Sequence, residues 1–196
     1  MSTILWVLIS FISGSIPFSF LLGKIILHTD IRKYGDGNPG AFNAWKAGKA
    51  KIGLPALLLD FLKGVIPVMI AVRVVGITGW GVIAVALAPI IGHAFSPFMK
   101  FHGGKAVAVT FGIWTALTLW QGPTIIGTFL GISSTLKIAD AWSVIISMLG
   151  LLIFLIFYYS ISGFDQFTFF IWTGNIMILA YKHRDEFKKG FRRKSK

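Results

Sequence analysis

A glycine-rich polar stretch between two apolar segments reads GDGNPGAFNAWK over residues 35–46. It supplies residues that can bind an anion, namely Gly35, Gly37, Gly40, Asn38, Asn43 and Lys46. The glycines permit positive φ angles, so successive backbone N–H groups can converge on one point. The asparagines would add neutral donors and the lysine a positive charge. The stretch is therefore either a phosphate-binding loop or a simple connector.

A second polar stretch, GHAFSPFMKFHGGKAVAV, covers residues 92–109. His93 ends one apolar segment, and Gly103, Gly104 and Lys105 precede the next. Free N–H groups at a helix N-terminus, the positive end of the helix dipole and an ammonium group together favour an anion. The spacing is not that of a nucleotide-binding P-loop. The other interpretation is a short turn with a membrane-anchoring lysine.

A third polar stretch, YKHRDEFKK, begins at residue 181 and contains His183 and Glu186. On one membrane face, the three stretches would surround a pocket for a small phosphorylated molecule. Asp36 conflicts with that interpretation, because its carboxylate would repel a phosphate unless a cation pairs with it. Candidate cations are Lys33, Lys46 and Lys105.

The elements that carry these stretches are membrane helices. Of the 196 residues, 55% are apolar and only 13% charged, whereas soluble domains average about 25% charged residues. Apolar segments cover residues 4–23, 54–75, 80–98, 106–120, 122–136, 141–160 and 166–181. They predict an all-α integral membrane protein with about seven transmembrane helices and short loops, in one polytopic domain over 1–196. Five spans result if two short segments are re-entrant.

The lysines and arginines predict the orientation of the chain. They concentrate in the loops 24–53 and 99–105, at Lys137, and in the tail 182–196. With seven spans all these segments lie on one side, which the positive-inside rule makes the cytoplasm, with the N-terminus outside. The net charge of +12 thus reflects topology and anionic lipid, and not nucleic acid. We expect a multi-pass protein of the cell (inner) membrane.

Composition also excludes some chemistry. The chain has no cysteine, so disulfides, thiolate metal sites and cysteine nucleophiles are impossible. No internal repeat of the kind found in inverted-repeat transporters is visible. Within the predicted spans, Asp60 and Lys63 lie three residues apart and can pair, either as a structural ion pair or as part of a site. Pro17 and Pro67 are expected to kink their helices, and Ser13, Gly14 and Ser15 to pack against a neighbouring helix.

Motifs over nearly the whole chain resemble one family. The stretches SGSIPFSFLLGK, DIRKYGDGNPGAFNAWKAG, DFLKG, GHAFSPFMKFHGGKAVA and KHRDEF are similar, in order and spacing, to the bacterial acyl-phosphate:glycerol-3-phosphate acyltransferases of the PlsY type. The resemblance implies transfer of a fatty acyl group from acyl-phosphate to glycerol 3-phosphate, giving lysophosphatidic acid for phospholipid biosynthesis. It implies no cofactor, no metal and no obligate protein partner. Because an acyl-phosphate is already activated, positioning and charge stabilisation suffice for the transfer.

Carried over by motif position, the resemblance assigns two groups of residues. Catalytic roles fall on Asp36, Lys46, His93, Lys105 and His183, and substrate binding on Gly37, Asn38, Gly40, Asn43, Gly103, Gly104 and Glu186. Several positions depart from the family pattern. Asp36 stands for a serine, Phe42 for a threonine, Lys46 for an arginine, Ala106 for a glycine and Glu186 for an asparagine. The family's later glutamate has no counterpart.

These departures leave several functions open. The first is a working acyltransferase in which Asp36 accepts the acceptor's proton or orients Lys46. The second is a diverged paralogue that acylates a different, less anionic hydroxyl acceptor, because Asp36 and Glu186 both make a phosphate site less positive. The third is a non-catalytic lipid-binding membrane protein. A small-solute transporter is the weakest alternative, because the chain shows no repeat.

Overall fold

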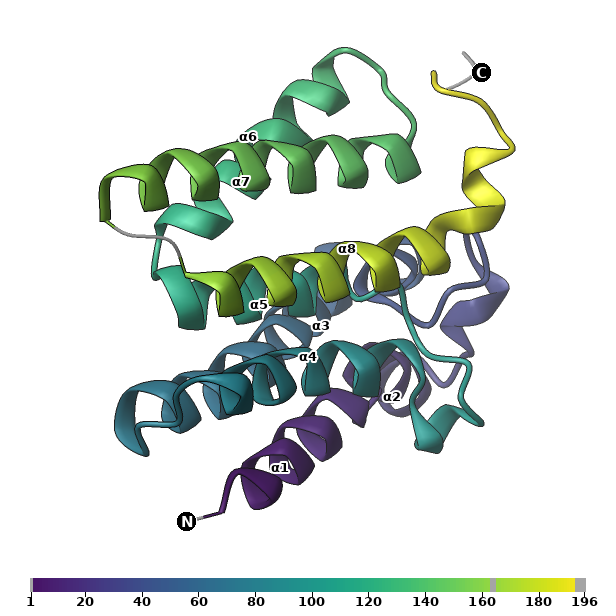
Figure 1. Cartoon of the computed structure of the whole chain (residues 1–196). Coiled ribbons are helices and arrows are strands. Elements are labelled where there is room, and N and C mark those ends of the chain that lie inside the picture. Colours follow the sequence, from purple (N-terminus) through teal and green to yellow (C-terminus); the bar gives the residue numbers. More distant parts are fainter. Residues whose placement is uncertain (1, 163–164, 193–196) are drawn as a thin grey trace.

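The computed structural model describes residues 2–162 and 165–192, and over these residues it is a bundle of helices without strands (Figure 1). The predicted all-α class is therefore confirmed for the described part of the chain. In chain order the helices are α1 (Thr3–Ser15), α2 (Phe18–Ile26), α3 (Ala41–Met69), α4 (Trp80–Ala94), α5 (Val107–Thr118), α6 (Gln121–Thr135), α7 (Asp140–Ser162) and α8 (Gln166–Phe187). Short helical turns follow α2, α3 and α4, at Ile31–Lys33, Ile70–Val74 and Pro97–Met99.

Four helical segments among the described residues are long and apolar enough to cross a membrane: Thr3–Ile26, Ala41–Val74, Trp80–Met99 and Asp140–Ser160. The helix Val107–Thr118 is apolar but shorter. The predicted segments 122–136 and 166–181 correspond to α6 and α8, which lie outside this group. Each predicted apolar segment is thus helical, but they differ in length and polarity.

The prediction of a loop over residues 24–53 is wrong in its second half. α3 begins at Ala41, well before the apolar run that starts at residue 54. Lys49, with φ 51° and ψ −148°, then kinks the helix, so that a short polar segment leads into the long apolar one. Hydropathy detects only the apolar part, and therefore placed the start of the helix too late.

Close helix packing relies on small residues, as is typical of membrane bundles. A Cβ at Gly14 of α1 would lie 2.2 Å from the Pro89 carbonyl oxygen of α4. Similarly, a Cβ at Gly112 of α5 would lie 2.3 Å from the Phe61 carbonyl oxygen of α3. The predicted packing of the SGS stretch is therefore confirmed at Gly14. α8 packs against both α4 and α7, and so connects the two halves of the bundle (Figure 1).

Pro17 breaks its helix as expected, whereas α3 continues through Pro67 and has non-helical φ and ψ angles only at Lys49. The first apolar segment breaks at Ile16 and Pro17, between α1 and α2. Pro67 has no N–H to donate to the carbonyl of Lys63, one turn earlier. The Ser13 hydroxyl donates to that carbonyl oxygen instead, over 3.1 Å. The Lys63 ammonium in turn donates to the Ile16 carbonyl oxygen over 2.8 Å. The free carbonyl near each proline is thus bonded by a polar group from the other helix.

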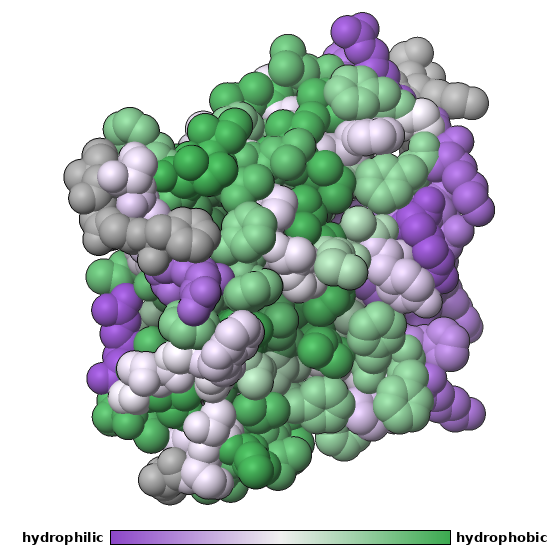
Figure 2. All heavy atoms as spheres, viewed as in Figure 1, coloured by the Kyte–Doolittle hydropathy of each residue, from purple (hydrophilic) through white to green (hydrophobic). Residues whose placement is uncertain are grey.

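Hydrophilic residues gather at one end of the bundle (Figure 2). In that view they line the right-hand edge, where Figure 1 places the C-terminal end of α8 and the connections after α2 and α4. The broad face that remains is mostly apolar. The three polar sequence stretches therefore meet at the same end of the molecule.

Candidate active site

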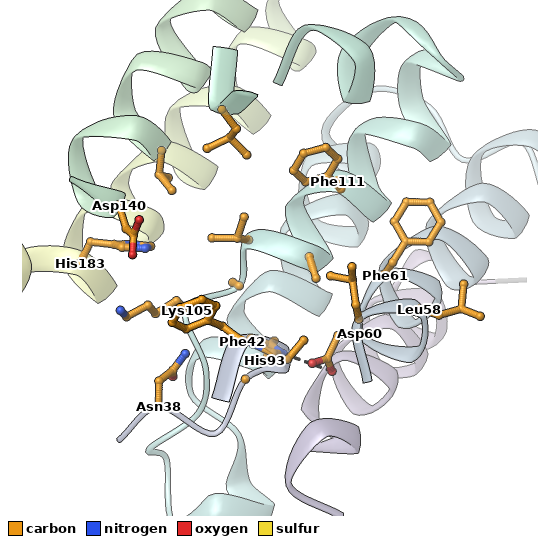
Figure 3. Close-up of a pocket in the computed structure, with 18 of the residues that line it drawn as sticks. Asn38, Phe42, Leu58, Asp60, Phe61, His93, Lys105, Phe111, Asp140 and His183 are labelled. Carbon is orange, nitrogen blue, oxygen red and sulfur yellow. Dashed lines mark ion pairs between the residues drawn. The ribbon is translucent and has the colours of Figure 1, made fainter. Parts of the chain in front are cut away.

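A cavity of about 1010 Å³ opens at the polar end and extends between the helices. Its polar lining comes from the loop before α3, the loop before α5, and the helices α3, α4, α7 and α8: Asp36, Asn38, Asp60, His93, Lys105, Asp140, Ser143 and His183. Its apolar wall comes from α3, α5, α6 and α7: Leu54, Leu57, Leu58, Phe61, Val107, Phe111, Leu130 and Val144. In Figure 3, His183, Asp140, Lys105 and Asn38 lie on one side and Leu58, Phe61 and Phe111 on the other, where Asp60 lies beside Phe61. The cavity therefore suits a molecule with a polar head and an apolar tail.

The loop before α3 is organised by Asp36. One carboxylate oxygen of Asp36 accepts the Asn43 side-chain amide over 2.8 Å and the Asn38 backbone N–H over 3.2 Å. The same Asn43 amide donates to the Asn38 carbonyl over 2.8 Å. Asn43 is buried and has a structural role in the loop, and its contact with substrate stays a prediction.

The glycines of this loop behave differently from one another. Gly35 and Gly37 have φ angles of 60° and 78°, as expected. The expectation of positive φ at Gly40 is wrong, because its φ is −106°. Gly40 is the N-cap of α3, and its carbonyl accepts the N–H groups of Asn43 and Ala44. An ordinary extended φ suits an N-cap position, and the early start of α3 places Gly40 there.

Lys105 is the charged centre of the polar end. Its ammonium contacts the second carboxylate oxygen of Asp36 and also a carboxylate oxygen of Glu186. Burial would lower the pKa of Lys105, but hydrogen bonds to Asp36 and Glu186 and their charges raise it. Burial would likewise raise the pKa of Asp36, and the hydrogen bond and charge of Lys105 outweigh this and lower it to about 2. Asp36 and Lys105 are therefore both charged at neutral pH.

The GGK loop is shaped by contact with His93. A Cβ at Gly103 would lie 1.9 Å from the His93 carbonyl oxygen, and one at Gly104 would lie 2.1 Å from the His93 Nε2 atom. The Gly104 N–H donates to the His93 carbonyl over 3.0 Å, so the expectation that it is free for an anion is wrong. Lys182 of α8 donates to the Gly103 carbonyl over 2.9 Å and fixes the loop from the other side. The glycines thus serve close packing, which positions Lys105.

His183 points into the cavity beside Asp140 (Figure 3). Its Nδ1 atom lies 2.8 Å from the Leu179 carbonyl oxygen. Because a carbonyl only accepts, Nδ1 carries the proton, and Nε2 of the neutral ring is left as an acceptor. His183 can therefore accept a hydrogen bond from a substrate hydroxyl.

Deeper in the cavity, Asp60 and Lys63 form the predicted ion pair, at 2.8 Å. Asp60 also accepts from the Ser19 hydroxyl over 2.6 Å, and His93 Nδ1 lies 3.9 Å from the carboxylate (Figure 3). Both roles considered from the sequence are compatible with this geometry. The pair connects α3 to the break between α1 and α2, and Asp60 also lines the cavity.

Among the predicted catalytic residues, Lys46 is the one that does not line the cavity. Its ammonium lies over the ring of Phe42, 4.6 Å from the ring centre. The cation that pairs with Asp36 is Lys105. The proposal that Asp36 orients Lys46 is therefore wrong. Since Lys46 and Phe42 lie one turn apart on α3, the helical start at Ala41 places them together.

The sequence did not single out Asp140, Lys182 or the individual residues of the apolar wall. Asp140 lies in the first turn of α7, where a carboxylate is also explained by the helix dipole, so its type gave no distinct signal. Lys182 was counted only as a charge of the tail. Among the described residues, no group of three or more His, Asp or Glu side chains could hold a metal ion.

The arrangement defines a helical bundle of the membrane type, with a cavity that has a polar end around Lys105 and an apolar wall between helices. Residues 4–193 match the family described as Glycerol-3-phosphate acyltransferase, and the chain belongs to this family of membrane acyltransferases. The resemblance inferred from the motifs, and the class of enzyme it implied, are thereby confirmed.

Relatives cover almost the whole chain. It is 38% identical to Glycerol-3-phosphate acyltransferase 1 of Thermotoga maritima, over 92% of this chain and 94% of the relative. It is 29% identical to the Glycerol-3-phosphate acyltransferase of Streptococcus pyogenes serotype M1, over 96% and 90% of the two chains.

A solved structure has the same fold. The crystal structure of PlsY (YgiH), an integral membrane glycerol 3-phosphate acyltransferase in its glycerol 3-phosphate form, is 29% identical and superposes with a TM-score of 0.85, over 96% of this chain and 92% of that one. Its lysophosphatidic acid form superposes with a TM-score of 0.83. This similarity to a solved integral membrane protein confirms the prediction of an integral membrane protein.

Proposed function

We propose that this protein transfers a fatty acyl group from acyl-phosphate to the 1-hydroxyl of glycerol 3-phosphate, forming lysophosphatidic acid. The observation that carries the proposal is the position of Lys105. Its ammonium lies at the boundary between the polar loops and the apolar cavity wall. The acyl chain would lie against Leu58, Phe61 and Phe111, and the phosphates would lie at the polar end beside Lys105.

The polar residues then have distinct roles. The Lys105 ammonium stabilises charge on the reacting phosphate and carbonyl oxygens. Asp36 accepts the hydrogen bond of the attacking hydroxyl, and the Nε2 atom of His183 accepts from the acceptor's other hydroxyl, so that together they orient the acceptor. Gly103 and Gly104, packed on His93, hold Lys105 in place. Gly37, Asn38 and Gly40 form the loop that covers the head group, and Asn43 holds that loop in shape.

The proton of the hydroxyl goes to the departing phosphate. The hydroxyl oxygen bonds to the carbonyl carbon, and the bond from that carbon to the phosphate oxygen breaks. Asp36, with a pKa of about 2, is a poor proton acceptor near neutral pH. A phosphate group with a second pKa of about 6 is the stronger base. Asp36 is therefore a positioning group for the hydroxyl and does not retain the proton.

We place the reaction on the cytosolic side of the cell (inner) membrane, in a single polytopic domain with about seven spans. The basic loops and tail lie at the polar end seen in Figure 2, and the positive-inside rule assigns that end to the cytoplasm. This orientation leaves the N-terminus outside and the C-terminus inside. Glycerol 3-phosphate would enter from the cytosol.

The direct test is an assay of the detergent-purified protein with acyl-phosphate and glycerol 3-phosphate. We expect lysophosphatidic acid and inorganic phosphate in equal amounts. Lys105→Ala should lower kcat by about 10²–10³-fold, as removal of one charge-stabilising donor does. Lys100→Ala removes an exposed lysine from the same connection and should leave the rate nearly unchanged. Absence of product from the wild type would reject the proposal.

A less anionic hydroxyl acceptor is the second candidate, and one observation favours it. Asp36 and Glu186 both contact Lys105, so the site holds more negative than positive charge around that ammonium. A screen of uncharged and zwitterionic alcohols with acyl-phosphate tests this candidate. Product from such an alcohol, without product from glycerol 3-phosphate, would establish it. Bound lipid without turnover of any acceptor would instead indicate a non-catalytic lipid-binding protein.

A further inference from the structure

The two carboxylates that contact Lys105 are held in different ways. The other oxygen of Asp36 accepts hydrogen bonds from Asn38 and Asn43, so Asp36 is fixed within the loop. Glu186 has Lys105 as the hydrogen-bond partner of its Oε1 atom. Its other oxygen, Oε2, is buried and has no hydrogen-bond donor. Glu186 is thus attached to the site through Lys105 and lacks the second anchor that Asp36 has.

This arrangement is unfavourable for Glu186. A buried carboxylate oxygen without a donor loses its hydration and regains nothing. The side chain is nevertheless only partly enclosed, with 18% of its surface exposed. It can therefore leave by rotating about its own bonds. Lys182, one turn earlier on α8, is fixed to the carbonyls of Ala94 and Gly103, so the helix itself need not move.

An acceptor phosphate would need the position that Glu186 occupies. An ammonium group has three N–H donors, and in this structure Asp36 and Glu186 each take one. A phosphate placed beside Lys105 would find only one of the three N–H donors free. It would also be repelled by the adjacent negative charge of Glu186. Because Asp36 is fixed in the loop, Glu186 is the group that can move aside.

We infer that Glu186 is a displaceable internal anion that competes with the acceptor's phosphate for Lys105 and thereby sets the affinity for the acceptor. The inference rests on the proposed function and names the residue that determines its acceptor specificity. Lys189, which is exposed and lies three residues later in the turn that follows α8, offers the displaced carboxylate a new cation. Glu186 is thus a specificity-determining residue, and its removal should tighten binding of glycerol 3-phosphate.

The alternative role for Glu186 is structural. If its pair with Lys105 chiefly fixed α8 to the GGK loop, removing the carboxylate would misplace Lys105 and weaken both binding and catalysis. The two roles predict changes of opposite sign in the KM for glycerol 3-phosphate. A kinetic measurement therefore separates them.

The experiment compares Glu186→Gln with the wild type as full-length protein in detergent. We expect the KM for glycerol 3-phosphate to fall by about 5–10-fold, because an internal competitor of like charge is gone. We expect kcat to change less than KM. Asp185→Asn is the matched control, since this neighbouring carboxylate pairs with Arg184 and Lys188. The control should leave KM unchanged.

A second readout does not depend on turnover. Isothermal titration with inorganic phosphate should show tighter binding to Glu186→Gln than to the wild type or to Asp185→Asn. If Glu186→Gln does not fold, Glu186→Asp shortens the carboxylate and should lower KM to a smaller extent. An unchanged or raised KM in a folded variant overturns the inference. Wild-type protein without lysophosphatidic acid product would instead reject the proposed function itself.

Discussion

At the level of single residues, Asp36 combines two tasks in one carboxylate. One oxygen closes the loop through Asn38 and Asn43, and the other contacts Lys105. A serine could replace neither the charge nor both acceptor positions at once. The loop of this protein is therefore built around an ionised side chain, and its shape depends on the ionisation of Asp36.

The stability of the protein should reflect that ionisation. The pKa of Asp36 is about 2 in the folded protein, below its ordinary value of 3.8. A lowered folded-state pKa gives stability that is present above about pH 4 and is lost as the pH falls toward 2. The melting temperature of the wild type should therefore exceed that of Asp36→Asn at pH 7, and the difference should shrink between pH 4 and 2. A difference that is constant over this range would contradict the prediction.

At the level of elements, the long helix α3 depends on a buried ion pair. Lys63 is paired with Asp60 and also donates to the Ile16 carbonyl at the break between α1 and α2. Both side chains are almost completely buried. Removing one member of such a pair leaves an uncompensated charge, which costs more than the intact pair contributes.

Lys63→Met should therefore destabilise the protein by about 3–5 kcal/mol, seen as a lower midpoint of unfolding in detergent. The double variant Lys63→Met with Asp60→Asn removes both charges and should recover part of the loss. Asparagine matches aspartate in size and methionine is only one atom shorter than lysine, so packing changes little. If the single variant is as stable as the wild type, or the double variant is less stable than the single one, the pair does not have this role.

Several elements could be predicted because local chemistry determines them. Seven apolar segments follow from hydropathy, and the effects of Pro17 and Pro67 follow from their missing N–H groups. The three polar stretches could be placed at one end by charge alone. Each of these features depends on residues that are neighbours in the sequence.

Other features depend on tertiary contacts that no local pattern encodes. The start of α3 at Ala41 and the kink at Lys49 place Gly40 at an N-cap and Lys46 over Phe42. The need for glycine at Gly104 comes from His93 on another element. Several lysines could have paired with Asp36. The partner is Lys105, and this follows only from the positions of the two loops in the folded protein.

At the level of the whole molecule, the orientation in the membrane can be tested directly. The chain contains no cysteine, so a single introduced thiol reports its own position without background. We expect Ser2→Cys in intact bacterial cells to react with a membrane-impermeant maleimide from outside. Lys189→Cys should react only after the membrane is permeabilised. The reverse pattern of labelling would show that the N-terminus lies in the cytoplasm.

The cavity wall has a consequence for how the enzyme meets its lipid substrate. Leu54, Leu57 and Leu58 line the cavity and yet are 54%, 48% and 55% exposed, so this wall of α3 also borders the surrounding hydrocarbon. A long-chain donor can therefore enter the cavity laterally from the bilayer, without passing through water. The rate then follows the donor's surface density within the leaflet. Diluting the donor with inert phospholipid at constant bulk concentration should slow the reaction, as in surface-dilution kinetics.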